Sequence, residues 1–421
     1  MAIPRKRSFW AVALGHMTND IFASMGPVLL AFLSVDILSI TNTQIGAAVS
    51  AQQMTGALSQ PLFGWLADRT GGRWQRLIGA GGVAWMAAML MLSLALALTG
   101  RFWLMIIPYA LAALGSGAFH PVGTMLAAES DKDHAASHVS YFFLMGQSGL
   151  AIGPALAGFL LDQANPAGGP QVTVTPIFIM ALFALPAVLF TAFAMQPTKR
   201  VHARQDMPHT ETRSTGLSAS VPIRALVILA LMVALRSLAQ PGLVAFIPVL
   251  FQQKGWGPTE YGLITSSFWI ASGMAGVFLG HLADRHDRRH IIAFSLLLAV
   301  PALFFLPVVT AKPVAFALAI ATGALTGGSH SVIVVLSQSL LPGSKGLASG
   351  ATLGFIFATG ALGSLIIGNL SDQIGLASAF QVVAGVVVMA GLMALFLPAG
   401  TQTTDRQETE SERQTLTTPA R

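Results

Sequence analysis

The chain has no cysteine, which excludes disulfide bonds and thiol chemistry. Charged side chains are also scarce: only 10% of the 421 residues are Asp, Glu, Lys or Arg, and 54% are hydrophobic. Soluble domains usually carry about 25% charged residues, so this chain cannot cover a water-exposed surface of its size. The composition indicates that lipid is its main solvent.

Some recognisable sites of chemistry are absent too. The sequence contains no Walker loop and no nucleophile constellation, which argues against ATP hydrolysis and against an enzyme. Its histidines lie on separate apolar runs, so we expect no metal site. No cofactor is expected either.

Apolar runs of about 20 residues, long enough to cross a bilayer, recur along the chain. They predict an all-α membrane protein with twelve transmembrane helices, near residues 9–35, 44–66, 77–98, 103–128, 139–161, 176–195, 223–250, 259–283, 291–309, 314–341, 347–371 and 377–397. Residues 1–196 and 223–398 are expected to form two six-helix bundles. Polar composition predicts a cytoplasmic linker at 197–222 and a disordered cytoplasmic tail at 399–421.

The distribution of Lys and Arg predicts the orientation of these spans. With the basic start of the chain inside, 19 of the 23 Lys and Arg residues fall in loops or tails on the cytoplasmic side. The outer loops hold only Arg101, Lys254 and Lys312. We therefore expect a multi-pass protein of the inner membrane with both termini in the cytoplasm. The excess of Lys and Arg over Asp and Glu follows from this topology, so we expect no nucleic-acid partner. The expected surroundings are the lipid bilayer. We expect a monomer.

The chain contains an internal repeat. Residues 64–69 and 280–285 both read Gly-x-Leu-Ala-Asp-Arg and lie 216 positions apart, and weaker copies at 158–162 and 368–372 lie 210 apart. On the predicted topology the first two copies end spans inside and the other two end spans outside. This pattern predicts inverted three-helix repeats, as in many transporters. A shift of 216 also matches two threonines that we interpret as helix caps, Thr43 and Thr259.

The segment from Gly64 to Arg73 resembles the motif that follows the second span in the Major Facilitator Superfamily. The copy at Gly280 departs from that motif because Asp287 occupies the later glycine position. The resemblance implies the two-bundle major facilitator fold. It also implies that the motif gates transport through seven residues: Gly64, Asp68, Arg69, Arg73, Gly280, Asp284 and Arg285.

Further stretches narrow the resemblance. The glycines and proline at Gly149, Gly153, Pro154 and Gly158 resemble the antiporter motif of drug/proton exchangers, with Ala157 in place of one glycine. The segments 15–20, 117–121 and 340–343 are similar to the fosmidomycin-resistance group of exporters. That group commonly has Glu after its His-Pro pair, where this chain has Val122.

Few ionisable residues lie deep in the predicted spans. They are His16, Asp20, His120, Arg236 and His330, and they fall on every third span. The family resemblance implies that these four spans line a central cavity. A charge at the bilayer centre costs about 2.5–3.5 kcal/mol on insertion scales, so such residues face water, form pairs or serve function. The repeat offsets make Asp20 and Arg236, and His120 and His330, candidate partners across the two halves.

We assign hypothetical roles to these residues. Asp20, with His16 one helical turn away on the same face, is the candidate for proton coupling. Arg236 carries a permanent cation and a planar donor fork that suits a carboxylate or phosphonate. The other candidates for binding substrate are His120, His330, Asn19, Gln52 and Gln147. Structural alternatives stand beside these roles: an Asp20–Arg236 ion pair, and interhelical hydrogen bonds for the histidines and glutamines.

The sequence therefore predicts a proton-coupled secondary transporter. The favoured form is an antiporter that exports a small organic compound or drug, similar to fosmidomycin, by alternating access. One alternative is a proton-coupled importer of an organic anion. Another is a membrane receptor or assembly subunit that transports nothing.

Overall fold

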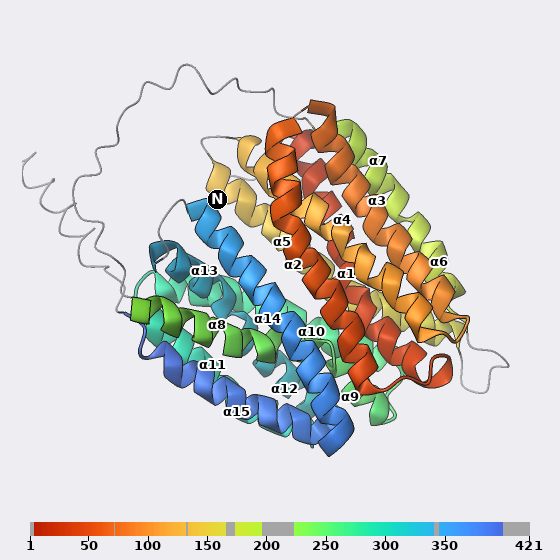
Figure 1. Cartoon of the computed structure of the whole chain (residues 1–421), viewed down its shortest axis with the longest axis vertical. Helices are drawn as coiled ribbons and strands as arrows, with labels where there is room; N and C mark the ends of the chain where they lie inside the picture. The colour runs from red at the N-terminus through yellow and green to blue at the C-terminus, as the bar shows by residue number, and fades with distance from the viewer. Residues whose placement is uncertain are drawn as a thin grey trace, which may run out of the picture.

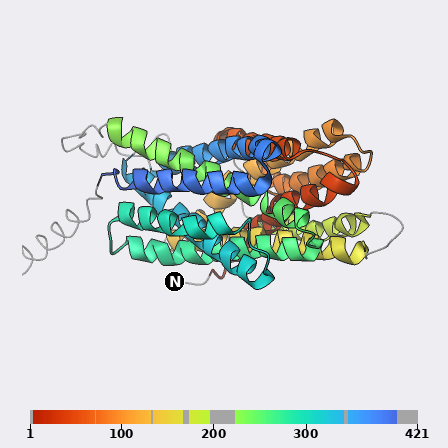
Figure 2. The same cartoon turned by 90° about the horizontal axis from the view of Figure 1, so that it is seen from below.

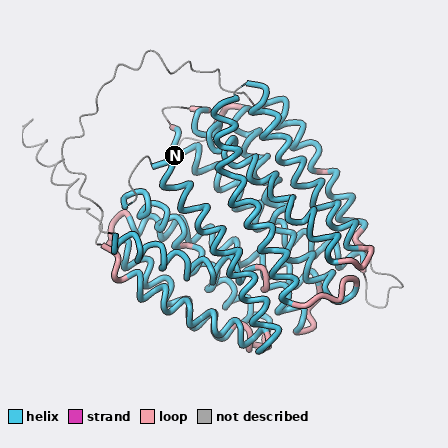
Figure 3. The backbone as a smooth tube through the Cα atoms, in the orientation of Figure 1, coloured by secondary structure: helices cyan, strands magenta, loops and turns pink. Residues whose placement is uncertain are grey.

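The computed structural model describes residues 4–70, 72–131, 134–165, 173–195, 223–340 and 345–398. Within these ranges the chain is helical apart from turns and short connections, and no strand occurs (Figure 3). The linker predicted at 197–222 and the tail predicted at 399–421 both lie outside the described residues.

The first half of the chain forms seven helices that build the six predicted spans. They are α1 (Arg7–Asp36), α2 (Asn42–Thr70), α3 (Gly72–Ala97), α4 (Phe102–Glu129), α5 (Ala135–Ala164), α6 (Thr175–Leu182) and α7 (Ala184–Ala194). Together α6 and α7 make one span, interrupted at Phe183. Pro186 accounts for this break, because a proline lacks the backbone N–H and clashes with the carbonyl one turn earlier.

The second half forms the other six spans. Its helices are α8 (Ile223–Val244), α9 (Ile247–Gln253), α10 (Pro258–Ala283), α11 (Arg288–Phe305), α12 (Lys312–Thr322), the π-helix η1 (Gly323–Gly327), α13 (Ser329–Leu340), α14 (Lys345–Ile374) and α15 (Leu376–Ala394). Two of these spans are broken. Pro248 stands at the start of α9 and interrupts the seventh span, and η1 interrupts the tenth.

Eleven stretches in the described part of the chain are long and apolar enough to cross a membrane. The twelfth predicted span is α2, whose 29 residues give it the necessary length. Its middle contains Gln52, Gln53, Thr55 and Ser59, which lower its hydropathy. Because its neighbours cover this polar stretch, α2 belongs to the bundle although its composition is not that of a lipid-facing helix.

The helices form two bundles, with α1–α7 on one side and α8–α15 on the other (Figure 1). They run side by side in the view from below as well (Figure 2). The outer surface is rich in exposed apolar side chains: Phe183, Phe193 and Trp103 are 74%, 80% and 70% exposed. Exposed apolar surface of this extent marks contact with lipid, which agrees with a multi-pass membrane protein.

The two bundles meet along α2 with α14 and α5 with α10. A Cβ atom added at Gly46 of α2 would lie 2.4 Å from the carbonyl oxygen of Ser364 on α14. A Cβ atom added at Gly262 of α10 would lie 2.4 Å from the carbonyl oxygen of Pro154 on α5. These contacts are related by the offsets of 216 and 210 seen in the sequence, so the repeat is present in the packing as well as in the motifs.

Candidate functional site

The glycines of the two long motif copies occupy equivalent places. Gly64 on α2 faces Pro121 of α4, and Gly280 on α10 faces Ser331 of α13. Arg69 lies over the ring of Trp65, with 4.2 Å between its guanidinium carbon and the ring centroid. Asp284, at the C-terminal cap of α10, and Arg285 are exposed. The side chains of Asp68 and Arg73 lie outside the described residues.

The glycines of the antiporter-like motif place α5 against two partners. An added Cβ at Gly149 would lie 2.4 Å from the carbonyl oxygen of Met17 on α1, and one at Gly153 would lie 2.1 Å from the Ser24 hydroxyl oxygen. On the opposite side, Gly158 lies directly against the carbonyl of Pro258 on α10. The motif therefore joins the first helix of one bundle to a helix of the other.

The weaker motif copies end in acids that accept hydrogen bonds from the first turn of a helix in the opposite bundle. Asp372 at the end of α14 accepts hydrogen bonds from the Asn42 and Thr43 N–H groups, at 3.0 and 2.8 Å, and from the Thr43 hydroxyl at 2.6 Å. Asp162 at the end of α5 accepts from the Thr259 hydroxyl at 2.8 Å. We call these two contacts the outer caps, because they lie at the end that the charge distribution predicts to be outside.

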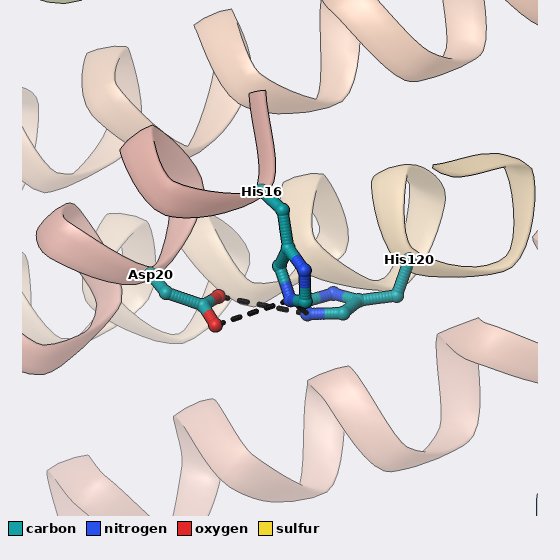
Figure 4. A group of neighbouring side chains, drawn as sticks. All are labelled: His16, Asp20 and His120. Atoms are coloured by element: carbon teal, nitrogen blue, oxygen red, sulfur yellow. Dashed lines mark hydrogen bonds and ion pairs between the residues drawn. The ribbon is translucent and has the colours of Figure 1, made fainter. Parts of the chain in front are cut away.

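Three ionisable side chains of the first half converge between α1 and α4 (Figure 4). His16 Nε2 lies 3.2 Å from one carboxylate oxygen of Asp20, and His120 Nε2 lies 3.5 Å from the other. The two Nε2 atoms are 3.0 Å apart. His16 and Asp20 are 2% and 7% exposed. We call these three residues the His-Asp-His cluster.

Backbone carbonyls fix the tautomers of both rings. His16 Nδ1 lies 2.8 Å from the carbonyl oxygen of Phe142, and His120 Nδ1 lies 2.8 Å from that of Ser116. A carbonyl oxygen only accepts hydrogen bonds, so both Nδ1 atoms carry hydrogen. In neutral rings both Nε2 atoms then present lone pairs to each other and to Asp20. At these distances, such a set of acceptors is stabilised by a proton or a metal ion between them.

Asn19, Ser116 and Gly146 complete this cluster. The Asn19 amide donates to Asp20 Oδ1 at 3.0 Å and to the Ser116 hydroxyl at 3.2 Å. Gly146 of α5 leaves room for the ring of His16, since an added Cβ would lie 2.4 Å from His16 Nε2. Sequence reasoning missed Ser116 and Gly146. Their spacing in the sequence could have indicated both residues. Ser116 precedes His120 by one helical turn, and Gly146 precedes Gly149 by about one turn.

The His-Asp-His cluster contradicts the argument that histidines on separate apolar runs cannot form a metal site. The histidines lie on separate helices, but packing brings two of them together with Asp20, with their ligand-type atoms within 4.8 Å of one another. This group meets the spacing that metal binding requires. It equally meets the requirement of a site that holds a proton.

The predicted pairing across the halves is wrong. Asp20 contacts the histidines of its own bundle rather than Arg236. Arg236 on α8 is 1% exposed and donates through Nη2 to the carbonyl oxygen of Thr326 in η1, at 2.8 Å. His120 likewise pairs with His16 and not with His330. His330, at the start of α13, is half-buried and lies within electrostatic reach of Arg236.

The predicted amides lie in helices at the boundary between the bundles. Gln52 on α2 is 9% exposed, and its Nε2 has no hydrogen-bond partner among the described residues. Gln147 on α5 lies beside Gly273 of α10, and its Oε1 likewise has none among them. Both side chains therefore keep hydrogen-bonding capacity at the place where the two halves face each other.

Comparison with known proteins identifies the family. The model of the Major Facilitator Superfamily matches residues 10–257 and 229–420. The fosmidomycin resistance protein of Escherichia coli K12 is 26% identical over 392 residues, which is 92% of each chain. An uncharacterized MFS-type transporter of Bacillus subtilis 168 is 27% identical over 394 residues, again 92% of each chain.

The fold agrees with this sequence similarity. The crystal structure of a bacterial homolog of the human lysosomal transporter Spinster superimposes with a TM-score of 0.76 at 14% identity, covering 92% of this chain and 96% of that one. The family model and the relatives match nearly the whole chain. These matches agree with the two bundles, the inverted repeat and the motif at Gly64. The chain belongs to the Major Facilitator Superfamily of transporters and resembles its fosmidomycin-resistance group.

Proposed function

We propose that this protein is a proton-coupled antiporter of the inner membrane that exports a small organic compound or drug by alternating access. The observation that carries the proposal is the His-Asp-His cluster. Its two Nε2 lone pairs and the Asp20 carboxylate converge within hydrogen-bond distance in a buried place. One proton shared among them turns mutual repulsion into hydrogen bonds, and the cluster with that proton is electrically neutral.

In this proposal, loss of the shared proton couples proton movement to the conformational change of transport. It leaves a carboxylate beside two lone pairs, an arrangement that is stable only if water or another cation reaches it. The cluster packs against α5 at Gly146 and Gly149, and α5 contacts α10 of the other bundle at Gly158. A change of protonation therefore acts on a helix that touches both bundles. Transport requires that proton and substrate each favour a different conformation.

The remaining site residues take their proposed roles from position. Asp20 and His16 exchange the proton, and His120, which the sequence had assigned to substrate, shares this task. Arg236, His330, Asn19, Gln52 and Gln147 are the proposed substrate-binding residues. The motif copies at Gly64 and Gly280, with Asp68, Arg69, Arg73, Asp284 and Arg285, are the proposed gate at the inner ends. Similarity to a fosmidomycin resistance protein supports a drug-like substrate.

The test uses purified protein in proteoliposomes with an imposed pH gradient and a screen of candidate drugs. The expected result is drug movement against proton movement, together with drug-induced proton flux. In Asp20→Asn the shared proton has no carboxylate, so proton flux falls by at least about ten-fold, or 1.4 kcal/mol. Asp131→Asn, on the surface, serves as the control.

Other outcomes select the alternatives. Drug uptake together with protons, measured in vesicles of both orientations, would identify an importer of organic anions. Protein that moves no solute and no protons would indicate a receptor or assembly subunit. Undiminished proton dependence in Asp20→Asn would remove the cluster from the mechanism.

A further inference from the structure

Arg236 is a buried cation whose charge no described side chain balances. Its side chain is 1% exposed, and no carboxylate of the described residues lies within 4.0 Å of its nitrogens. Within the described residues, its hydrogen bond goes from Nη2 to the carbonyl oxygen of Thr326. Nε and Nη1 are buried and have no hydrogen-bond partner in this part of the chain.

Such an arrangement is costly unless a partner arrives. An arginine side chain keeps its charge at every physiological pH. Removing one partner of a buried pair typically leaves an uncompensated charge that is strongly destabilising. Asp20, the carboxylate that the repeat places in the equivalent position, is occupied by His16, His120 and Asn19. The compensating charge must therefore come from outside the described part of the chain.

The anchoring of Arg236 favours a ligand over accidental burial. The Thr326 carbonyl belongs to η1, a single turn of π-helix that interrupts the tenth span. Turns of this kind are frequent at functional sites. The hydrogen bond to Thr326 holds the guanidinium at Nη2 and leaves the donors at Nε and Nη1 available. His330, the next ionisable group along the same span, adds a second polar group within electrostatic reach.

We propose that Arg236 binds an oxyanion of the transported compound, a carboxylate or a phosphonate, through the donors at Nε and Nη1. This inference rests on the proposed transport function and specifies the charge of the substrate. Planar guanidinium groups match the two oxygens of such anions in a bidentate way. The substrate class is then small organic anions, and proton and anion sites lie in different bundles.

The test measures ligand binding without any proton gradient. The full chain in lipid nanodiscs is titrated at fixed pH with benzoate, phenylphosphonate and benzamide, the last being the neutral counterpart of benzoate. We expect millimolar or tighter binding of at least one anion and weaker binding of benzamide. Arg236→Gln should weaken anion binding by at least about ten-fold and leave benzamide unaffected. Arg236→Lys keeps the charge without the fork and should fall between.

The results separate this inference from the proposed function. Anion binding and proton flux are measured separately in the same protein, so intact anion binding without drug-induced proton flux would contradict only the antiporter mechanism. Equal affinity for benzoate and benzamide, anion binding that is unchanged in both Arg236 variants, or no measurable affinity for either anion at millimolar concentration would each overturn the anion site.

Discussion

At the residue scale, the central feature is that backbone carbonyls determine the state of two histidines. The Phe142 and Ser116 carbonyls each occupy one Nδ1 atom, so both rings turn their remaining nitrogen toward Asp20. The shared proton therefore stabilises the folded cluster, because without it three hydrogen-bond acceptors would face one another. A histidine held only by side chains would be free to change its tautomer and lose this property.

Gly146 provides a way to disturb the cluster without altering any titratable group. In Gly146→Ala the new methyl group would collide with His16 Nε2 and would lie 2.9 Å from Asp20 Oδ2, so His16 must move. We expect drug-induced proton flux to fall by at least about ten-fold while the protein still folds.

The control for this prediction is Gly81→Ala in α3, where an added Cβ meets nothing within 4 Å. Both changes place alanine in a helix, so helix propensity affects them equally. Both variants are assayed in the same proteoliposomes. Equal proton flux in the two variants would show that the position of His16 does not matter.

Part of this site could be predicted from the sequence. The spacing of His16 and Asp20 places them on one helix face, and the structure confirms this. The partner of Asp20 could not be found in that way. An offset of 216 identifies Arg236 as the equivalent residue in the other half, and equivalence means a similar place in each bundle rather than contact. The meeting of α1 with α4 depends on tertiary packing, for which the local sequence carries no signal.

At the element scale, α5 is the helix that connects the cluster to the second bundle. One side of it contacts α1 through Gly149 and Gly153, and the other contacts α10 through Pro154 and Gly158. Long apolar runs predicted the spans to within a few residues. They did not predict the interruptions at Phe183, before α9 and in η1, because prolines and π-turns change the hydrogen bonding without changing the hydropathy.

The outer caps make a graded prediction about conformation. Asp372 accepts three hydrogen bonds and Asp162 one, so Asp372→Ala should weaken closure of this end more than Asp162→Ala. Losing a side chain that accepts from the first N–H groups of a helix, as Asp372 does, costs about 0.5–2 kcal/mol. The measurement is the distance distribution between spin labels on cysteines introduced at Leu98 and Ile374, both exposed, in a chain that has no cysteine of its own.

For Asp372→Ala we expect a larger population of long distances than in the parent chain, with Asp162→Ala in between. The helix N-terminus of α2 loses both an acceptor and a negative charge in this variant, and both favour separation. Identical distributions in all three proteins would mean that the caps contribute nothing to closure.

At the scale of the whole molecule, the arrangement of charge predicts which end faces the cytoplasm. A green fluorescent protein fused to the C-terminus should fluoresce in a bacterial host, and alkaline phosphatase at the same place should be inactive. Fusions after Ala164, the last residue of α5, should show the reverse. The opposite pattern at both places would invert the proposed orientation, and with it the assignment of the caps to the outside.

The paired contacts of Gly46 with Ser364 and of Gly262 with Pro154 have a mechanical consequence. Two points define a line, and turning one bundle about the line through them moves neither touching backbone apart. The far ends can therefore part while these two contacts keep this end closed. Release of a drug on this side then requires the same two contacts to separate, so closing one end and opening the other are steps of one rotation.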